Sequence, residues 1–329
     1  ADAKFGKNYL KRIDGYDVII KSPGIPIHLR EVEKAFQKGK VTSQTEIFFN
    51  NCKNLIIGVT GTKGKGTTAS LIYKILKEAG RDAYLVGNIG KPALSFLPSS
   101  KPEKIYVYEL SSHQLFGLRS APDIAVFLNI YPDHLDYFKN FREYVLAKSN
   151  IVRYQKGSQY LIYNHQDKVV REMVKASKAK KIPIKNYHGI LRYLKIKKPP
   201  AALRGRHNLL NIAAATKAAQ LLIVPEEKIS RGIRRFEGRE HRLEFVGKFQ
   251  GIEFYNDSAS TIPEYSIAAI DALGSKVETI ILGGSEKGAD FKNLAKRILN
   301  SKIKNVILFP PSGGRIWQEI LKRQKRALK

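Results

Sequence analysis

Cysteine is almost absent from this sequence, which has one, Cys52, among 329 residues. A single cysteine excludes a disulfide within the chain and favours a reduced, cytoplasmic protein. Long hydrophobic runs are also missing: none approaches the ~20 residues that a membrane-spanning helix needs, and no signal peptide is recognisable. Hydrophobic residues still make up 43% of the chain, so we expect a globular protein with two or three domains.

Acidic residues are scarce relative to basic ones. The chain has 29 Asp and Glu against 58 Lys and Arg, a net charge of +29. Such an excess can indicate nucleic-acid binding, which stays open as an alternative. The basic residues are spread over the chain, however, and the densest stretches, 175–185 and 322–329, lack the interleaved aromatic residues on which bases stack. We therefore interpret most of the charge as a lysine-rich solvated surface, with some bias towards anionic small substrates.

A glycine-rich loop is the strongest local motif. The apolar run Leu55–Thr60 predicts a buried strand, and the spacing of apolar residues over Thr67–Ala79 predicts a helix. The loop between them, with the start of the helix, predicts a phosphate site formed by Gly61, Thr62, Lys63, Gly64, Lys65, Gly66, Thr67 and Thr68. Loop amides and a helix N-terminus attract anions, a lysine adds a charge, and a hydroxyl can bind Mg²⁺. A purely structural glycine turn is the alternative, because Val59 replaces the first glycine of the usual pattern and Gly66 separates Lys65 from the first hydroxyl.

Strands and helices alternate along the chain. Further strands are expected at 83–86, 105–110, 124–130 and 160–163, and helices at 141–154, 167–177 and 207–222. This alternation predicts an α/β fold with a mostly parallel sheet, whose ligands bind beyond the carboxyl ends of the strands. Lys65, Glu109 and His134 all fall at such ends.

The pattern restarts near Phe236–Arg239. Strands at 243–246, 252–255, 279–282 and 305–309 and helices at 263–273, 291–299 and 316–327 predict a second, Rossmann-like α/β domain. At the other end, a strand at 16–20 and a helix at 31–38 are too little for a domain of their own. We expect a partial N-terminal domain (1–48), a central ATP-binding domain (49–238) and a C-terminal domain (239–329), with the chain lacking both ends of a longer protein.

Two further residues, at the ends of predicted strands, could carry chemistry. Glu109, at a strand end beside the phosphate loop, is a candidate Mg²⁺ ligand, although an isolated acid there is more often a cap or a salt-bridge partner. His134, in Asp133-His134-Leu135-Asp136, is a candidate ligand of a second metal ion. Lys148, on the helix that follows, has no distinguishing local feature.

Taken together, the motifs resemble those of the Mur ligases in order and over nearly the whole chain. The motifs are Ser22-Pro23-Gly24-Ile25, the Thr-Gly-Thr loop, Gly87-Asn88-Ile89-Gly90, Glu109-Leu-Ser-Ser-His-Gln, Asp133-His134-Leu135-Asp136, Ala147-Lys148, His207-Asn208-x-x-Asn211, Glu240-His241-Arg242, Asn256-Asp257-Ser258 and Gly283-Gly284-x-x-Lys287-Gly288. The first and fourth motifs are most similar to those of the D-glutamate-adding branch. The resemblance implies an ATP-dependent amide ligase of peptidoglycan synthesis that forms an acyl phosphate.

The resemblance also implies residue roles. Lys65 and the loop amides would hold phosphates, and Mg²⁺ ions would be held by Thr67, Glu109, His134 and a carbamylated Lys148. ATP would further contact Asn208, Asn211, Arg242 and Asp257. The UDP-N-acetylmuramoyl-L-alanine substrate would face Ser22, Gly24, Asn88, Ser111 and Gln114, and D-glutamate would meet Lys287. The expected protein is a cytoplasmic monomer that binds neither nucleic acid nor membrane.

Two departures from the family pattern keep alternatives open. Gly66 stands where Mur ligases commonly carry a hydroxyl, and Ala259 stands where the pattern Asn-Asp-Ser-Lys has a lysine that helps to bind D-glutamate. Another Mur ligase, a folylpolyglutamate synthase-like enzyme and a non-catalytic nucleotide-binding scaffold therefore remain as hypotheses.

Overall fold

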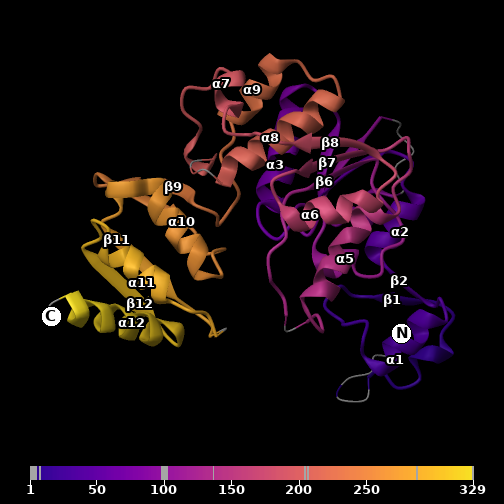
Figure 1. Cartoon of the computed structure of the whole chain (residues 1–329), viewed down its shortest axis with the longest axis horizontal. Helices are drawn as coiled ribbons and strands as arrows, with labels where there is room; N and C mark the ends of the chain where they lie inside the picture. Colours follow the sequence, from indigo (N-terminus) through magenta and orange to yellow (C-terminus); the bar gives the residue numbers. More distant parts are fainter. Residues whose placement is uncertain are drawn as a thin grey trace. The chain divides into compact units, whose positions relative to one another are not determined.

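The computed structural model describes residues 6, 9–97, 103–135, 137–203, 205, 207–286 and 288–327. The chain divides into two compact units (Figure 1), one comprising Ala1–Lys198 with Arg206–Phe236 and the other Pro199–Gly205 with Glu237–Lys329. Within the described residues, no helix is both long and apolar enough to cross a membrane. The three predicted domain ranges stay a prediction.

A parallel sheet is the centre of the first unit. Its strands, in spatial order, are β4 (Ala83–Gly87), β5 (Ile105–Glu109), β3 (Leu55–Thr60), β6 (Ile124–Phe127), β7 (Tyr160–Asn164) and β8 (Lys180–Ile184). Every neighbouring pair is parallel, which confirms the expected sheet. Strands β5 and β6 are buried at every residue and β3 at all but its first, as expected for strands covered on both faces. Because the chain runs from β3 towards β4 on one side and later to β6 on the other, the order reverses at β3, where ligands bind in such sheets.

The helices of this unit pack on the sheet or on one another. They are α2 (Gln44–Asn51), α3 (Lys65–Glu78), α4 (Ser112–Leu115), α5 (Phe141–Arg153), α6 (Lys168–Met173), α7 (Ile190–Tyr193), α8 (His207–Leu221) and α9 (Glu226–Arg234). Helices α2, α5 and α6 share one core with the strands, to which Phe48, Tyr108, Phe127, Tyr144 and Val170 contribute. Helix α3 packs on strands β3, β4 and β5, and α8 packs on β6, β7 and β8. Helix α9 lies against α3 and α8, and α7 lies against α8.

The N-terminal part of the first unit is small. Strands β1 (Ile19–Lys21) and β2 (Val41–Ser43) pair in parallel and are joined through helix α1 (Arg30–Gln37). The predicted strand 16–20 is therefore displaced towards the C-terminus, and Lys21 is its last residue. The Ser22–Ile25 turn follows directly.

The second unit combines a hairpin with a two-stranded parallel sheet. Strands β9 (Glu244–Phe249) and β10 (Ile252–Asn256) are antiparallel, and both residues of the turn between them, Gln250 and Gly251, have positive φ. Strands β11 (Thr279–Gly283) and β12 (Asn305–Phe309) share a hydrophobic core with helices α10 (Pro263–Leu273), α11 (Lys292–Leu299) and α12 (Ser312–Ala327). This arrangement confirms the predicted second α/β unit.

Candidate active site

The phosphate loop and α3 are fixed by α8. Gly64 is the N-cap residue of α3, with φ +83°, and a Cβ on it would lie 2.3 Å from the Oδ1 of Asn211. Only glycine suits that position. The same Oδ1 accepts a hydrogen bond from the Thr68 hydroxyl (3.2 Å), and the Asn211 amide donates to the Oδ1 of Asn208 (2.9 Å). The structure therefore brings both predicted asparagines to the loop, while their contact with ATP stays a prediction.

Asn129, which follows β6, clamps the other end of the loop. Its Oδ1 accepts from the Lys63 amide (2.8 Å), its Nδ2 donates to the Lys63 carbonyl (3.0 Å), and its carbonyl accepts from the Thr62 amide (2.8 Å). The N–H groups of Thr62 and Lys63 are thus donated to Asn129 in this structure, while the binding of ATP by the loop residues stays a prediction. The first turn of α3, from Gly64 to Thr67, is the part of the loop whose amides point out of a helix N-terminus.

Lys65 begins α3, two residues earlier than the predicted helix, because Gly64 already ends the loop. Its Nζ donates to the Thr62 carbonyl (3.1 Å), which holds the ammonium beside the helix N-terminus. Of the two hydroxyls that follow, Thr68 is fully buried against α8 and Thr67 is partly exposed. Thr67 is therefore the hydroxyl of the two that a ligand can reach, and its binding of Mg²⁺ stays a prediction.

Glu109 ends β5 next to the phosphate loop and is 3% exposed. Its Oε1 accepts a long hydrogen bond from the Nδ2 of Asn88 (3.4 Å), and its main-chain carbonyl accepts from the Asn88 amide (3.1 Å). Its Oε2 is buried without a hydrogen-bond partner among the described residues. A buried carboxylate oxygen with no donor is costly, so this atom fits a bound cation.

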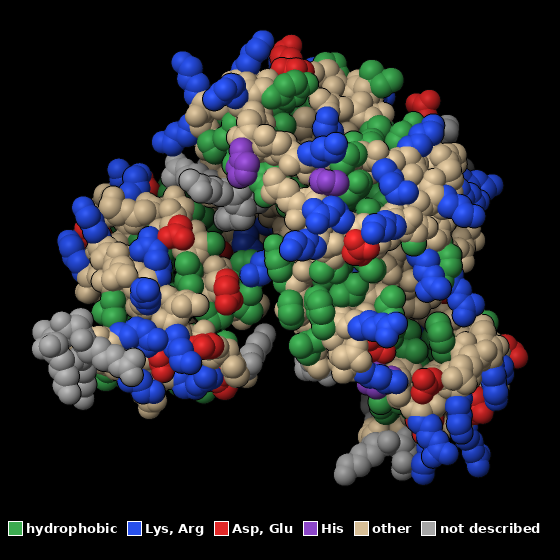
Figure 2. Space-filling view, viewed as in Figure 1, with side chains coloured by type: hydrophobic (Ala, Val, Ile, Leu, Met, Phe, Trp, Pro, Cys, Tyr) green, Lys and Arg blue, Asp and Glu red, His purple; other side chains and the backbone are tan. Residues whose placement is uncertain are grey.

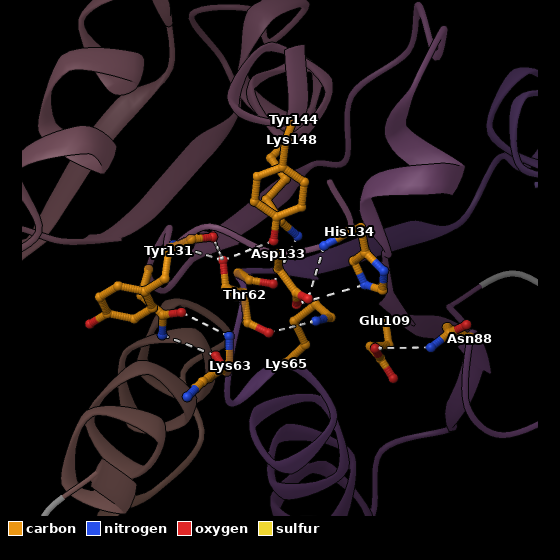
Figure 3. A network of polar contacts seen from close by, with 12 residues as sticks. Thr62, Lys63, Lys65, Asn88, Glu109, Tyr131, Asp133, His134, Tyr144 and Lys148 are labelled. Atoms are coloured by element: carbon orange, nitrogen blue, oxygen red, sulfur yellow. Dashed lines mark hydrogen bonds and ion pairs between the residues drawn. The ribbon is translucent and has the colours of Figure 1, made fainter. Parts of the chain in front are cut away.

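His134 lies at the same edge of the sheet (Figure 3). Its backbone is left-handed, with φ +53°, its side chain is exposed, and its Nε2 lies 3.7 Å from the Oδ2 of Asp133. The imidazole is thus accessible to a ligand, and the adjacent carboxylate adds negative charge. The sequence prediction gave Asp133 no role of its own, although the Asp-His pair was visible.

Lys148 projects from α5 into the protein and is 1% exposed. Its Nζ donates to the Gly61 carbonyl (2.9 Å) and lies 5.0 Å from the centre of the Tyr144 ring (Figure 3). Burial, reinforced by the nearby Lys65 ammonium, lowers the pKa of Lys148 well below its usual value, although the Asp133 and Glu109 carboxylates oppose the shift. This environment therefore favours the neutral, nucleophilic form of the Lys148 amine over the cation.

The predicted substrate residues fall into two groups. Ser22 and Gly24 are exposed on the turn after β1, and Asn88 is exposed beside Glu109. Ser111 and Gln114 instead form a capping box at α4, in which the Ser111 hydroxyl accepts from the Gln114 amide (3.2 Å) and the Gln114 side chain accepts from the Ser111 amide (2.9 Å). The pair therefore has a structural role whether or not it also meets substrate.

Arg242 and Asp257 lie in the second unit. The Arg242 guanidinium is 4.3 Å from the Tyr265 ring centre, and its Nη1 is buried without a hydrogen-bond partner among the described residues. Asp257 accepts hydrogen bonds from the Leu243 amide (2.8 Å) and the Ser260 hydroxyl. These contacts place the two predicted ATP residues close together. Lys287 lies outside the described residues.

Comparison with known proteins identifies the family. Residues 59–219 match the family model of the Mur ligase middle domain. The chain is 34% identical to the UDP-N-acetylmuramoylalanine–D-glutamate ligase of Clostridium botulinum, with 98% of this chain and 74% of the relative covered. The ligase with the same description from Caldanaerobacter subterraneus is 35% identical, over 97% of this chain and 73% of that one.

Solved structures agree at the level of the fold. A UDP-N-acetylmuramate-alanine ligase from Thermotoga maritima superposes with a TM-score of 0.64 at 17% identity, over 93% of this chain and 75% of that chain. The structure of MurF from Acinetobacter baumannii superposes with a TM-score of 0.67 at 18% identity, over 86% of this chain and 68% of that chain. The chain therefore belongs to the Mur ligase family of ATP-dependent ligases, which form carbon–nitrogen bonds.

Proposed function

We propose that this protein joins D-glutamate to UDP-N-acetylmuramoyl-L-alanine in peptidoglycan synthesis. The relatives named for this reaction match nearly the whole chain. The observation that carries the proposal is the meeting of three groups at one sheet edge: the N-terminus of α3, the unpartnered Oε2 of Glu109, and the buried amine of Lys148 (Figure 3). Together they provide an anion site, a cation ligand and a nucleophilic amine.

The reaction has two steps. A carboxylate oxygen of the UDP substrate attacks the γ-phosphorus of ATP, the bond to the bridging oxygen breaks, and ADP leaves. The amine of D-glutamate then attacks the acyl carbon, the bond to the phosphate oxygen breaks, phosphate leaves, and the nitrogen loses a proton. In both steps the first turn of α3 and Lys65 hold the phosphate, while Asn129 keeps the loop rigid.

Glu109, Thr67 and His134 would hold Mg²⁺. When bound, Mg²⁺ neutralises the phosphate charge that otherwise repels the attacking carboxylate. The unpartnered Glu109 oxygen, the accessible His134 ring and the partly exposed Thr67 hydroxyl suit this role. Asn88 orients the Glu109 carboxylate through its other oxygen.

Lys148 would serve this site as a carbamate. The lone pair of Nζ attacks the carbon of CO₂ and an N–C bond forms while one C–O π bond opens onto its oxygen. The nitrogen then loses a proton to water, so that the amine becomes an anionic carbamate. Only a neutral amine can react in this way, and burial favours the neutral form of Lys148. The carbamate would add a carboxylate-like ligand beside Glu109.

The remaining contacts and setting are proposed with the function. ATP would contact Asn208, Asn211, Arg242 and Asp257, and Lys287 would bind D-glutamate although Ala259 replaces the family lysine. We further propose a cytoplasmic monomer that does not bind nucleic acid. On the face drawn in Figure 2, Lys and Arg side chains are scattered among other residues, as expected for a solvated surface.

Phosphate release from ATP tests the proposal. The full-length protein is supplied with UDP-N-acetylmuramoyl-L-alanine and, in turn, D-glutamate, L-glutamate, L-lysine, L-alanine and meso-diaminopimelate. We expect release with D-glutamate alone. Release with another amino acid would retain the family and change the acceptor, whereas ATP binding without release under any condition would favour a non-catalytic scaffold.

A further inference from the structure

Lys21 is a buried lysine that belongs to no ligand set proposed above. It ends β1 and is 6% exposed. Its Nζ donates to two carbonyls of the following turn, Ser22 (3.0 Å) and Ile25 (2.8 Å). Burial lowers the pKa of Lys21 to about 8. Burial of a lysine costs desolvation free energy. In the contacts described, Lys21 bonds only to the neighbouring turn, so its role depends on the function of that turn.

Tyr137 reaches the same turn from a different part of the chain. It is 9% exposed, and its hydroxyl lies 3.0 Å from both the Pro23 and the Ile25 carbonyl oxygens. Its own amide donates to the His134 carbonyl (3.1 Å). Tyr137 therefore links the turn after β1 to the segment that carries His134, and it shares the Ile25 carbonyl with Lys21.

These bonds determine which amide the turn presents outward. The carbonyls of residues 22, 23 and 25 all face Lys21 or Tyr137. In a trans peptide the N–H points opposite to the carbonyl, so each inward carbonyl turns the next residue's N–H away from the protein. Residues 23 and 26 are prolines and have no N–H, and the Ile25 amide is donated to Ser22 (3.1 Å). Among the N–H groups that follow an inward carbonyl, the Gly24 amide is therefore the one that points outward in the contacts described.

The surroundings of Gly24 suit a ligand. Gly24 is exposed, and nothing lies within 4 Å of the place where a Cβ would be. Because this backbone is exposed and carries no side chain, an oxygen of an anionic substrate can approach the Gly24 amide closely.

We propose that Lys21 and Tyr137 are positioning residues that fix the Pro23–Gly24 peptide so that the Gly24 amide donates to the UDP substrate. The inference rests on the proposed function, because it assumes that this turn meets that substrate. Neither side chain touches the substrate. Their effect is on the affinity for the UDP substrate, and the binding of ATP at α3 is independent of it.

Two isosteric variants test the proposal. Tyr137→Phe removes the hydroxyl and keeps the ring, and Lys21→Met removes the amine and keeps the chain length. Lys40→Met is the matched control, because Lys40 also donates to a backbone carbonyl (Asp14, 2.9 Å) in this part of the chain but not on the turn. Initial rates are measured against the UDP substrate and against ATP, with melting temperatures for each variant.

We expect each test variant to raise the KM for the UDP substrate roughly tenfold, because a factor of this size corresponds to the loss of about one hydrogen bond. The kcat and the KM for ATP should change by less than about twofold. The double variant should raise the KM for the UDP substrate by less than the product of the two single-variant factors, because both side chains bond to the Ile25 carbonyl. The control should match the wild type.

Two results would overturn the inference. One is a wild-type KM for the UDP substrate in both variants; the other is an equal rise in both KM values, which indicates a general structural defect. Calorimetric binding of UDP-N-acetylmuramoyl-L-alanine to the wild type separates this failure from a failure of the proposed function. A wild type that does not bind it refutes the function, whereas a wild type and variants that bind it equally refute only the positioning role.

Discussion

Replacement of Lys148 gives the sharpest test of the carbamate. Lys148→Ala removes the amine and leaves a space beside the Gly61 carbonyl, near the Lys65 ammonium. Lys148→Met removes the amine but fills most of that space. A short carboxylate from solution can therefore replace the lost carbamate in the first variant and not in the second.

The expected magnitudes follow from the structure. Loss of a metal-binding anion worth about 4 kcal/mol in the transition state lowers kcat by roughly 10³-fold, so both variants should be almost inactive. Lys148→Met keeps the volume, removes a desolvated amine and loses one hydrogen bond to Gly61, so we expect unfolding free energy within about 1.5 kcal/mol of the wild type. Lys148→Ala should lose about 2–4 kcal/mol, as for other buried large-to-small substitutions.

The assay is phosphate release with formate, acetate or propionate added to each variant. Lys148→Ala should recover measurable turnover with at least one acid, and Lys148→Met with none. Activity near wild type in Lys148→Met would refute the reasoning, since a thioether cannot replace an anion at a cation site. Failure of every acid to restore Lys148→Ala, while that variant still binds ATP, would remove the support for a carbamate.

Three further predictions concern the loop, the cation ligand and pH. Gly64→Ala should raise the KM for ATP at least tenfold, because the new Cβ would lie 2.3 Å from the Oδ1 of Asn211 at a φ of +83°. Asn88→Ala should weaken Mg²⁺ activation about 10- to 100-fold by freeing the Glu109 carboxylate, measured as the Mg²⁺ dependence of phosphate release. In urea unfolding, the wild type should gain stability relative to Lys21→Met as the pH rises from about 8 towards 10. The folded pKa of Lys21 is about 8 against 10.5 for the free side chain, so the unfolded chain binds more protons in that window.

Each of these predictions has a control or a contrary result. Gly189→Ala is the control for Gly64→Ala, since its Cβ would meet nothing within 4 Å and its backbone is not left-handed. Unchanged Mg²⁺ dependence in Asn88→Ala would show that the Glu109 carboxylate needs no orientation. Parallel stability curves for the wild type and Lys21→Met above pH 8 would show that Lys21 titrates normally in the folded protein.

The sequence predicts the fold well where one signal determines an element. Leu55–Thr60, Pro263–Leu273 and Asn305–Phe309 have the predicted ends, because a continuous apolar run or an N1 proline sets them locally. Strand β8 (Lys180–Ile184) was missed. It contains two lysines and Pro183, lies in a basic stretch of the sequence, and pairs with β7 alone at the sheet edge. Its strand conformation depends on tertiary pairing.

The candidate site also combines residues that local sequence features predict with residues that they do not. Lys65 and Glu109 are recognisable because a loop and a strand end are local features. The role of Asn129 is not, since its reciprocal hydrogen bonds join residues 66 positions apart. For Lys148, local sequence offers no signal, and only the family resemblance pointed to it. Its physical distinction, burial with a lowered pKa, exists only in the folded chain.

Burial, and not charge, therefore distinguishes Lys21 and Lys148 from most lysines of this basic chain, whereas Lys65 is only half-buried and is recognised by its place in the phosphate loop. Among 58 Lys and Arg, only Lys21, Lys104 and Lys148 are buried lysines within the described residues. Two of these three donate to a backbone carbonyl of a predicted ligand-binding loop, Lys21 to the Ser22–Ile25 turn and Lys148 to Gly61. Removal of a solvated lysine outside the site should change solubility and little else. Removal of Lys21 should weaken the binding of the UDP substrate, and removal of Lys148 should slow phosphoryl transfer.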